Sequence, residues 1–323
     1  MGETAMAKSI KSIKGSERAY SRSHFVLEVD GEKISQVIRS IEGGGVKCEV
    51  ITYRSGRSPA QFRQLSRPKY EDLKLQISPS MSEPFYKWIA GFFNGKVERH
   101  SGAVCAADFH YSERARREFF EAMLLSFDWP TLDANDKNSC VITVTIKPER
   151  IRFAKGSGKS MDQVTGRGAT RLWLPSAFNF TIQGFEDACK RVVKIDGFSI
   201  KLNKIMEYHA GRMIDPVNVP GYLEYPNLSF HLPEANAQPF VDHLTKHVIK
   251  GKLQEATRRT GHIELIDHSK TDLCGITLEG VDISSVTPDK SDATSDSFKM
   301  VKVEATVERM KFKYTSAGKD LGS

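Results

Sequence analysis

The stretch YRSGR, Tyr53 to Arg57, decides how this chain is organised, because nearly the same word returns as YHAGR, Tyr208 to Arg212. The two words are 155 positions apart. A single five-residue match could arise by chance, whereas matches that keep one spacing along a whole domain could not. Internal repeats are therefore the first feature to test.

Further matches continue in both directions, and their spacing drifts in one direction from 153 to 159 positions. The matched residues are Phe25 and Phe178, Gly31 and Gly184, Ile41 and Ile195, Tyr70 and Tyr225, Leu73 and Leu228, Pro84 and Pro239, Phe85 and Phe240, Gly102 and Gly261, Asp108 and Asp267, and ERIRF (149–153) and ERMKF (308–312). The spacing changes where loops are expected. The sequence therefore predicts a tandem duplication of one domain of about 130 residues, which is an ordinary domain size.

Between the two copies, the segment KGSGKSMDQVTGRG is rich in Gly and Ser and has no apolar periodicity, so it reads as a flexible linker. The expected organisation is a flexible N-terminal arm (1–20), a first domain (21–155), a linker (156–169), a second domain (170–315) and a flexible tail (316–323).

Composition indicates soluble, well-packed domains: of 323 residues, 39% are hydrophobic and 27% are charged. No apolar run has the length of a membrane span, so we expect no membrane anchor. The net charge of +7 permits nucleic-acid contact, but acids and bases are interspersed. The five cysteines are scattered and odd in number, which favours buried thiols in a reducing compartment over disulfides or zinc.

Alternating apolar residues predict strands in both copies. FVLEV precedes an Asp30-Gly31 turn, and FNFTI precedes Gln183-Gly184. The segment ERARREFFEAMLLSF has a helical composition, but its counterpart LCGITLEGVDI reads as a strand, so the repeat favours a strand for both. The expected fold class is mainly β, a sandwich or barrel, with one packed α-helix in each domain.

That helix has clear boundaries in the first copy: Ser82 and Pro84 mark its start and Gly95 marks its end. The predicted core residues on its apolar face are Phe85, Trp88, Ile89 and Phe92 in the first copy, and Phe240 and Leu244 in the second.

Two motifs suggest chemistry, and a simpler interpretation fits each better. GSGKS resembles the end of a nucleotide-binding loop, but the position of that loop's first glycine holds Phe153. His243 and His247 have metal-binding spacing, but their counterparts are Trp88 and Phe92, which favours packing. We therefore predict no catalytic, cofactor-binding or metal-binding residues, no cofactor and no enzymatic activity.

Together these words resemble one family. The order F-x-x-x-[VI]-x-G, E-V-x-x-Y-R-x-G-R, K-Y-x-x-L and a P-F-x-x-W helix ending in Gly is similar to the tail tube proteins of contractile-tailed phages and contractile injection systems. The matching residues in the first copy are Tyr53, Arg54, Gly56, Lys69, Tyr70, Leu73, Trp88, Trp129, Pro130, Asp133 and Ala134. The second copy departs from the pattern: EYPNL replaces KYxxL, and His243 replaces the helix tryptophan.

The resemblance implies a structural role. Six such domains would close into a ring, and rings would stack into a hollow tube inside a contractile sheath, in contact with baseplate and spike proteins. DNA or an effector would pass through the lumen. The protein would reside in a virion tail or injection-system particle assembled in the host cytoplasm. The interface candidates that follow, on the Arg-containing loops, are Tyr53, Arg54, Arg57, Tyr208 and Arg212.

Because each chain carries two such domains, three chains would complete the ring, which predicts a trimer with pseudo-sixfold symmetry. Three alternatives remain open. Six chains could form the ring through one copy, with the other copy outside or in the next layer. The chain could be a baseplate hub or tube-initiator adaptor that joins a threefold spike to a sixfold tube. It could also be a nucleotide- or metal-dependent assembly factor built on GSGKS or HLTKH.

Overall fold

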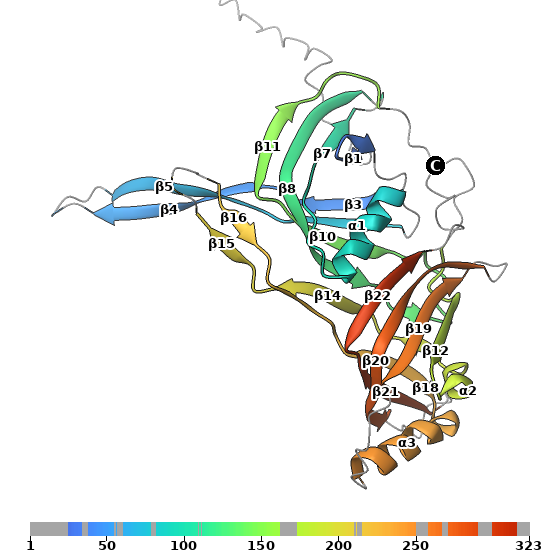
Figure 1. The fold of residues 1–323 in the computed structure, drawn as a ribbon. Coiled ribbons are helices and arrows are strands. Elements are labelled where there is room, and N and C mark those ends of the chain that lie inside the picture. Colours follow the sequence, from blue (N-terminus) through green and yellow to red (C-terminus); the bar gives the residue numbers. More distant parts are fainter. Residues whose placement is uncertain are drawn as a thin grey trace, which may run out of the picture.

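The chain folds mainly into β-strands with few helices, which confirms the predicted fold class (Figure 1). The computed structural model describes residues 25–33, 38–54, 56, 61–78, 82–108, 110, 112–161, 173–209, 211, 215–249, 258–266, 271–289 and 299–314. The predicted N-terminal arm and C-terminal tail lie outside these residues. Among the helices described, none has the length and apolar content needed to cross a bilayer.

The first half of the chain supplies one helix, most strands of a ten-stranded antiparallel sheet and the separate two-stranded sheet β4-β5. Its elements are β1 (Phe25–Val29), β2 (Glu32–Lys33), β3 (Ile38–Gly43), β4 (Val46–Arg54), β5 (Gln61–Tyr70), β6 (Leu73–Ile77), α1 (Glu83–Phe93), β7 (His100–Ala107), β8 (Glu113–Trp129), β9 (Leu132–Asp133), β10 (Ile142–Lys147) and β11 (Arg150–Lys155). The sheet order is β2-β1-β7-β8-β10-β6-β3, and β11 pairs with β8. The strand predicted for ERARREFFEAMLLSF is confirmed, since the segment lies in β8.

The second half repeats this plan. Its elements are β12 (Phe178–Ile182), α2 (Glu186–Cys189), β13 (Lys194–Ile195), β14 (Phe198–Asn203), β15 (Met206–Tyr208), β16 (Val217–Val219), β17 (Tyr222–Glu224), β18 (Leu228–Pro233), η2 (Glu234–Asn236), α3 (Gln238–Leu244), η3 (Thr245–Ile249), β19 (Arg259–Ile266), β20 (Asp272–Pro288), β21 (Met300–Thr306) and β22 (Arg309–Tyr314). The order β12-β19-β20-β21-β18-β13 matches β1-β7-β8-β10-β6-β3 of the first sheet, and β22 pairs with β20 as β11 pairs with β8.

The pairing register also agrees between the halves. Val144 pairs with Phe127 in the first sheet, and Val303 pairs with Val286 in the second. All four partners are 159 positions from their counterparts. Even the backbone irregularity recurs, because Glu121 in β8 and Gly280 in β20 both have positive φ, 50° and 68°. A residue-by-residue comparison of the halves is therefore meaningful.

Two details add to the expected organisation. The second half holds more than one helical element, because a four-residue helix, α2, precedes α3. The start of the predicted flexible linker is also held in place: Gly156 N–H donates to Arg114 O over 3.0 Å, and Ser112 forms a β-bridge with Ser160. The backbone amides and carbonyls at the start of β8 need partners, and this segment supplies them.

Helix α1 buries the face that the sequence predicts. Phe85, Trp88, Ile89 and Phe92 are all at most 2% exposed. The helix ends at Asn94 and Gly95, where Lys96 N–H donates to Gly91 O over 2.9 Å and closes the C-terminus. In the second half, Phe240 is buried in α3 and Leu244 is partly buried.

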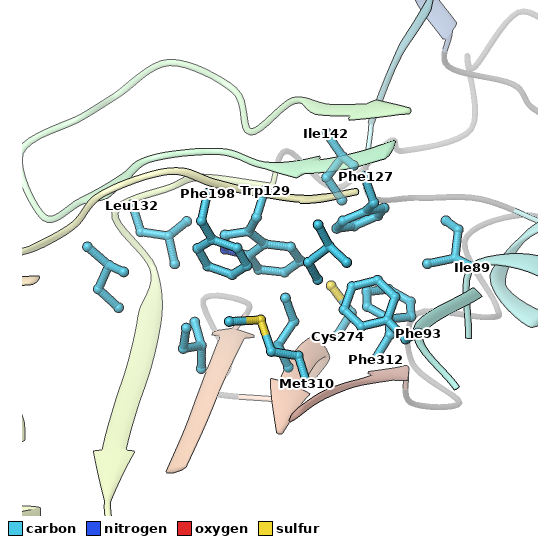
Figure 2. Packing of buried hydrophobic residues seen from close by; sticks show 14 of the residues in the cluster. Ile89, Phe93, Phe127, Trp129, Leu132, Ile142, Phe198, Cys274, Met310 and Phe312 are labelled. Carbon is cyan, nitrogen blue, oxygen red and sulfur yellow. The ribbon is translucent and has the colours of Figure 1, made fainter. Parts of the chain in front are cut away.

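A single large apolar cluster runs through both halves (Figure 2). It joins Trp129 of β8 and Phe93 of α1 to Phe312 of β22, so the halves share a core. Four cysteines are buried and Cys48 is exposed, and all five thiols are free. Burial raises the pKa of the Cys105, Cys140 and Cys189 thiols to about 12.

Candidate assembly interface

The two halves are joined by strand pairing. Strand β14 of the second half adds antiparallel to the free side of β8, with Ile200 opposite Phe127 and Phe198 opposite Trp129. A shorter pairing joins β13 to β9. The first sheet is therefore completed by a strand from the second half, which satisfies backbone groups that would otherwise form an open edge.

This added strand brings apolar side chains with it. Phe198 stacks on Trp129 (Figure 2), and their ring centroids are 6.4 Å apart. Ile200 is 0% exposed and Leu202 is 4% exposed. The alternation Phe198, Ile200, Leu202 places one whole face of β14 in the shared core.

Helix α1 closes the other side of the contact between the halves. Tyr86 stacks on Tyr314 of β22 at 4.8 Å, and Phe93 packs against Phe312 at 5.6 Å. Phe312 is itself only 8% exposed. The hydroxyl of Tyr225 donates to Phe93 O over 2.8 Å, and burial raises the pKa of Tyr225. We call the β8–β14, β9–β13 and α1–β22 contacts together the junction.

An ion pair in the first half holds the β15–β16 hairpin of the second half. Arg99 and Glu149 form a mostly buried pair. Glu149 Oε1 accepts the backbone N–H of Asn218 over 2.8 Å, and Arg99 Nη2 donates to Asn218 O over 2.5 Å. Both hydrogen bonds are made to backbone atoms of β16. They therefore require an extended strand at this place but no particular side chain. We call this pair the clamp.

A second polar contact lies nearby. The Tyr70 hydroxyl of β5 donates to Asp215 Oδ1 over 2.7 Å, which ties the first half to the loop before β16. Burial and this hydrogen bond raise the pKa of Tyr70 to about 12, because the phenolate would face a carboxylate in a partly desolvated position.

The β4–β5 hairpin, which we call the arm, extends away from the rest of the first half (Figure 1). Its apolar side chains face outward; the exposed large ones are Val46, Val50, Ile51, Tyr53, Phe62 and Leu65. Tyr53 and Phe62 stack on one another at 5.5 Å. An exposed apolar ribbon of this kind is typical of a surface that pairs with another chain.

The predicted interface residues lie at the ends of these hairpins. Tyr53 and Arg54 end β4, and Tyr208 ends β15; all three are exposed. Arg57 and Arg212 lie outside the described residues. The structure therefore places Tyr53 and Tyr208 at equivalent positions on two hairpins and does not bring them together.

Sequence reasoning missed the clamp, although a signal was present. Glu149 opens the repeated word ERIRF, and its counterpart Glu308 opens ERMKF. A charged residue kept in both copies beside a strand is a candidate for a contact that both copies make.

The two motifs that suggested chemistry have structural roles in the described residues. Residues 156–160 of GSGKS run along β8, where Ser157 Oγ donates to Glu113 Oε2 over 2.5 Å. His243 is a buried residue of α3 with Nε2 2.8 Å from Asp282 Oδ1, and burial lowers its pKa. Among the described residues, no group of three His, Cys, Asp or Glu side chains could hold a metal ion.

Residues 21–152 match the family model described as T4-like virus tail tube protein gp19. A search of curated proteins finds no match. Among solved structures, the chain is similar to one in the extended sheath–tube complex of the extracellular contractile injection system PVC, with 20% identity over 46% of this chain and 99% of that chain and a TM-score of 0.39.

Two further structures are similar to part of the chain. One belongs to the tube-terminating cap of the anti-feeding prophage, with 17% identity over 48% of this chain and 100% of that chain and a TM-score of 0.39. The other is the Hcp1 protein from E. coli EAEC 042, with 16% identity over 37% of this chain and 76% of that chain and a TM-score of 0.24.

Proposed function

We propose that this chain is a structural tail tube protein whose two halves, produced by tandem duplication, form (pseudo-)hexameric rings that stack into the inner conduit of a contractile tail or injection system. The observation that carries the proposal is the match of residues 21–152 to the tail tube family model. Under this proposal the chain is not an enzyme and needs no cofactor.

The duplication is supported by the matching strand order and register of the two sheets. We place the first domain at residues 21–155 and the second at 170–315. The junction supports a ring, because it joins two equivalent units head to tail: α1 and β8 of one unit contact β22 and β14 of the other. Head-to-tail contacts close into a ring when the rotation permits.

Three chains would supply six such units, so we propose a trimer with pseudo-sixfold symmetry. Its partners would be a surrounding sheath and the baseplate and spike proteins, and its lumen would pass DNA or an effector. Particle assembly would take place in the host cytoplasm.

One difference between the halves favours one alternative, a baseplate hub or tube-initiator adaptor. The first-half hairpin consists of two long strands, β4 and β5, of 9 and 10 residues, whereas the equivalent second-half hairpin is broken into β14 and β15 on one side and β16 and β17 on the other. A ring that alternates two kinds of hairpin has true threefold symmetry, which suits a threefold spike on one face and a sixfold tube on the other.

Two measurements test the proposal. Mass photometry of the purified chain should give a trimer, and negative-stain class averages should show a disc with a central hole. Long hollow tubes would favour the tube protein, and single discs would favour the adaptor. A chain that stays monomeric at every accessible concentration would overturn both.

A further inference from the structure

We propose that neighbouring chains join by repeating the junction found within the chain: the arm of one chain pairs with residues 284–288 of β20 in the next. The inference deepens the proposed ring and rests on it, since it names the surface through which three chains would close.

The receiving edge is open within the part of the chain that the structure describes. In β8, residues 126–128 are paired on both sides, by β10 and by β14. The equivalent residues of β20, 285–287, are paired with β21 alone among the described residues. One side of this segment therefore presents backbone groups of the kind that recruit another strand.

Side-chain exposure supports the same pairing. Residues that are buried in the junction have exposed counterparts in the arm. Ile200 is 0% exposed, and its counterpart Val46, 154 positions earlier, is 40% exposed. Leu202 is buried, and its counterpart Cys48 is exposed. The arm thus carries the apolar face of β14 without a sheet to cover it.

The helix contact shows the same asymmetry. Phe312, 8% exposed under α1, corresponds to Phe153, which is 61% exposed on β11. Phe93 of α1 is fully buried, and Val248, 155 positions later in η3, is 62% exposed. The α3–η3 segment of one chain could therefore cover β11 of the next, as α1 covers β22 within the chain.

Each half of the chain contains a clamp pair, and within the described part of the chain only the pair of the first half contacts a strand of the other half. Arg258 and Glu308, 159 positions after Arg99 and Glu149, form an ion pair at 3.5 Å. Their side chains are 78% and 56% exposed, compared with 28% and 12% for the first clamp. The second clamp has the correct composition and place to hold a strand.

The arm has the matching strand. Asn218, held by the first clamp, lies opposite Glu207 in the β15–β16 pair. The equivalent residues of the arm, Arg63 and Thr52, 155 positions earlier, are also opposite one another. Because the clamp contacts only backbone atoms, Arg63 can take the place of Asn218 without a change of chemistry.

The repeat also fixes the register between chains. Lys201 lies opposite Ser126 within the chain. Their counterparts are Lys47 of the arm and Ser285 of β20, so these two residues should face one another across the chain boundary. Opposed residues of antiparallel strands have Cα atoms about 4.5–5.5 Å apart, which lies within the range of a disulfide.

Cysteine cross-linking tests this register in the full chain. The variant Lys47→Cys/Ser285→Cys, in a Cys48→Ser background, should give two- and three-chain disulfide species on a non-reducing gel after mild oxidation. Co-expressed single variants, Lys47→Cys and Ser285→Cys, should stop at two chains. The matched control Lys47→Cys/Thr287→Cys, two residues out of register, should react at least about tenfold more slowly.

Each other outcome overturns a defined claim. If the chain is a trimer by mass but neither pair cross-links, or both react equally, the junction repeat is wrong and the ring stands. If disulfides form only within a chain, the arm folds back on its own β20 and the inference fails. If the chain is a monomer at every concentration, the inference and the proposed ring fail together.

Discussion

The residue pair Phe312 and Phe153 offers a sharp test, because both occupy the last position of the repeated words ERMKF and ERIRF. Phe312 packs at 5.6 Å from Phe93, 5.8 Å from Phe127 and 6.0 Å from Tyr86. Phe153 is 61% exposed. The substitutions Phe312→Ala and Phe153→Ala therefore remove the same atoms from equivalent positions that differ only in their surroundings.

The expected costs differ by several kcal/mol. Burying an aromatic side chain removes about 150–250 Å² from water, and at about 25 cal/mol per Å² this is worth about 4–6 kcal/mol. Alanine recovers part of this, and Phe→Ala substitutions in cores cost about 3–5 kcal/mol. Since Phe312 is 8% exposed, we expect Phe312→Ala to lower the free energy of unfolding by about 3–4 kcal/mol.

Phe153→Ala should change the free energy of unfolding of the isolated chain by less than about 0.5 kcal/mol, as surface substitutions usually do. Its effect should appear in association, where we expect the dissociation constant of the oligomer to rise at least about tenfold, equivalent to about 1.4 kcal/mol. Urea denaturation followed by tryptophan fluorescence, at concentrations below and above oligomer formation, separates the two effects.

Equal costs for the two variants in the isolated chain would refute the reasoning, because they would mean that Phe153 is as buried as Phe312. A loss below about 1 kcal/mol for Phe312→Ala would show that the α1–β22 contact does not hold the halves together.

Four further outcomes follow from the structure. Trp88→Ala, at a site 2% exposed where Nε1–H donates to Glu98 O, should cost about 3–5 kcal/mol in urea melts; an unchanged melt would place this helix face on an assembly surface. Gly102→Ala should lower the melting temperature far more than the matched Gly261→Ala. The new Cβ would lie 2.0 Å from Glu28 O at position 102 and 3.1 Å from Thr181 O at position 261. Equal shifts in melting temperature would contradict this expectation. Tyr70 has a folded-state pKa of about 12, above its ordinary value of about 10. Its contribution to the free energy of unfolding should therefore be complete below pH 10 and lost as the pH rises towards 12. In urea melts across that pH range, Tyr70→Phe should lose less stability with rising pH than the unmodified chain. Glu149→Gln should lower the melting temperature of the isolated chain, whereas Glu308→Gln should leave it unchanged and weaken association; the reverse pattern would rule out the second clamp.

The repeat explains why much of the fold was predictable from one sequence. The composition of the β8 segment favours a helix, and only its counterpart around Leu278 indicated a strand. If two copies share one fold, each segment must have a secondary structure that suits both sequences. A comparison of the copies therefore corrects a misleading local propensity in either one. The α1 core positions were also readable, since apolar spacing along a helix reports burial directly.

The junction was not predictable in the same way. Nothing in the local sequence says that Phe198 will stack on Trp129, since strand pairing between distant segments is decided by packing and not by propensity. The clamp was hidden for a related reason: Asn218 contributes only backbone atoms, so its side chain carries no record of the contact.

In the proposed ring, joining two units on one chain would change the thermodynamics of ring closure. Six separate units must form six contacts and lose translational and rotational freedom five times, whereas three linked pairs lose it twice. Three of the six junctions then form within a chain, where the partner is present at a high effective concentration. The remaining three can be weaker and still close the ring. Under this proposal, weaker contacts between chains would suit the α3–η3 segment, whose face is less apolar than that of α1, with Val248 in place of Phe93 and Leu244 in place of Ile89. If a ring could be rebuilt from separately expressed halves as readily as from the whole chain, linkage would confer no such advantage.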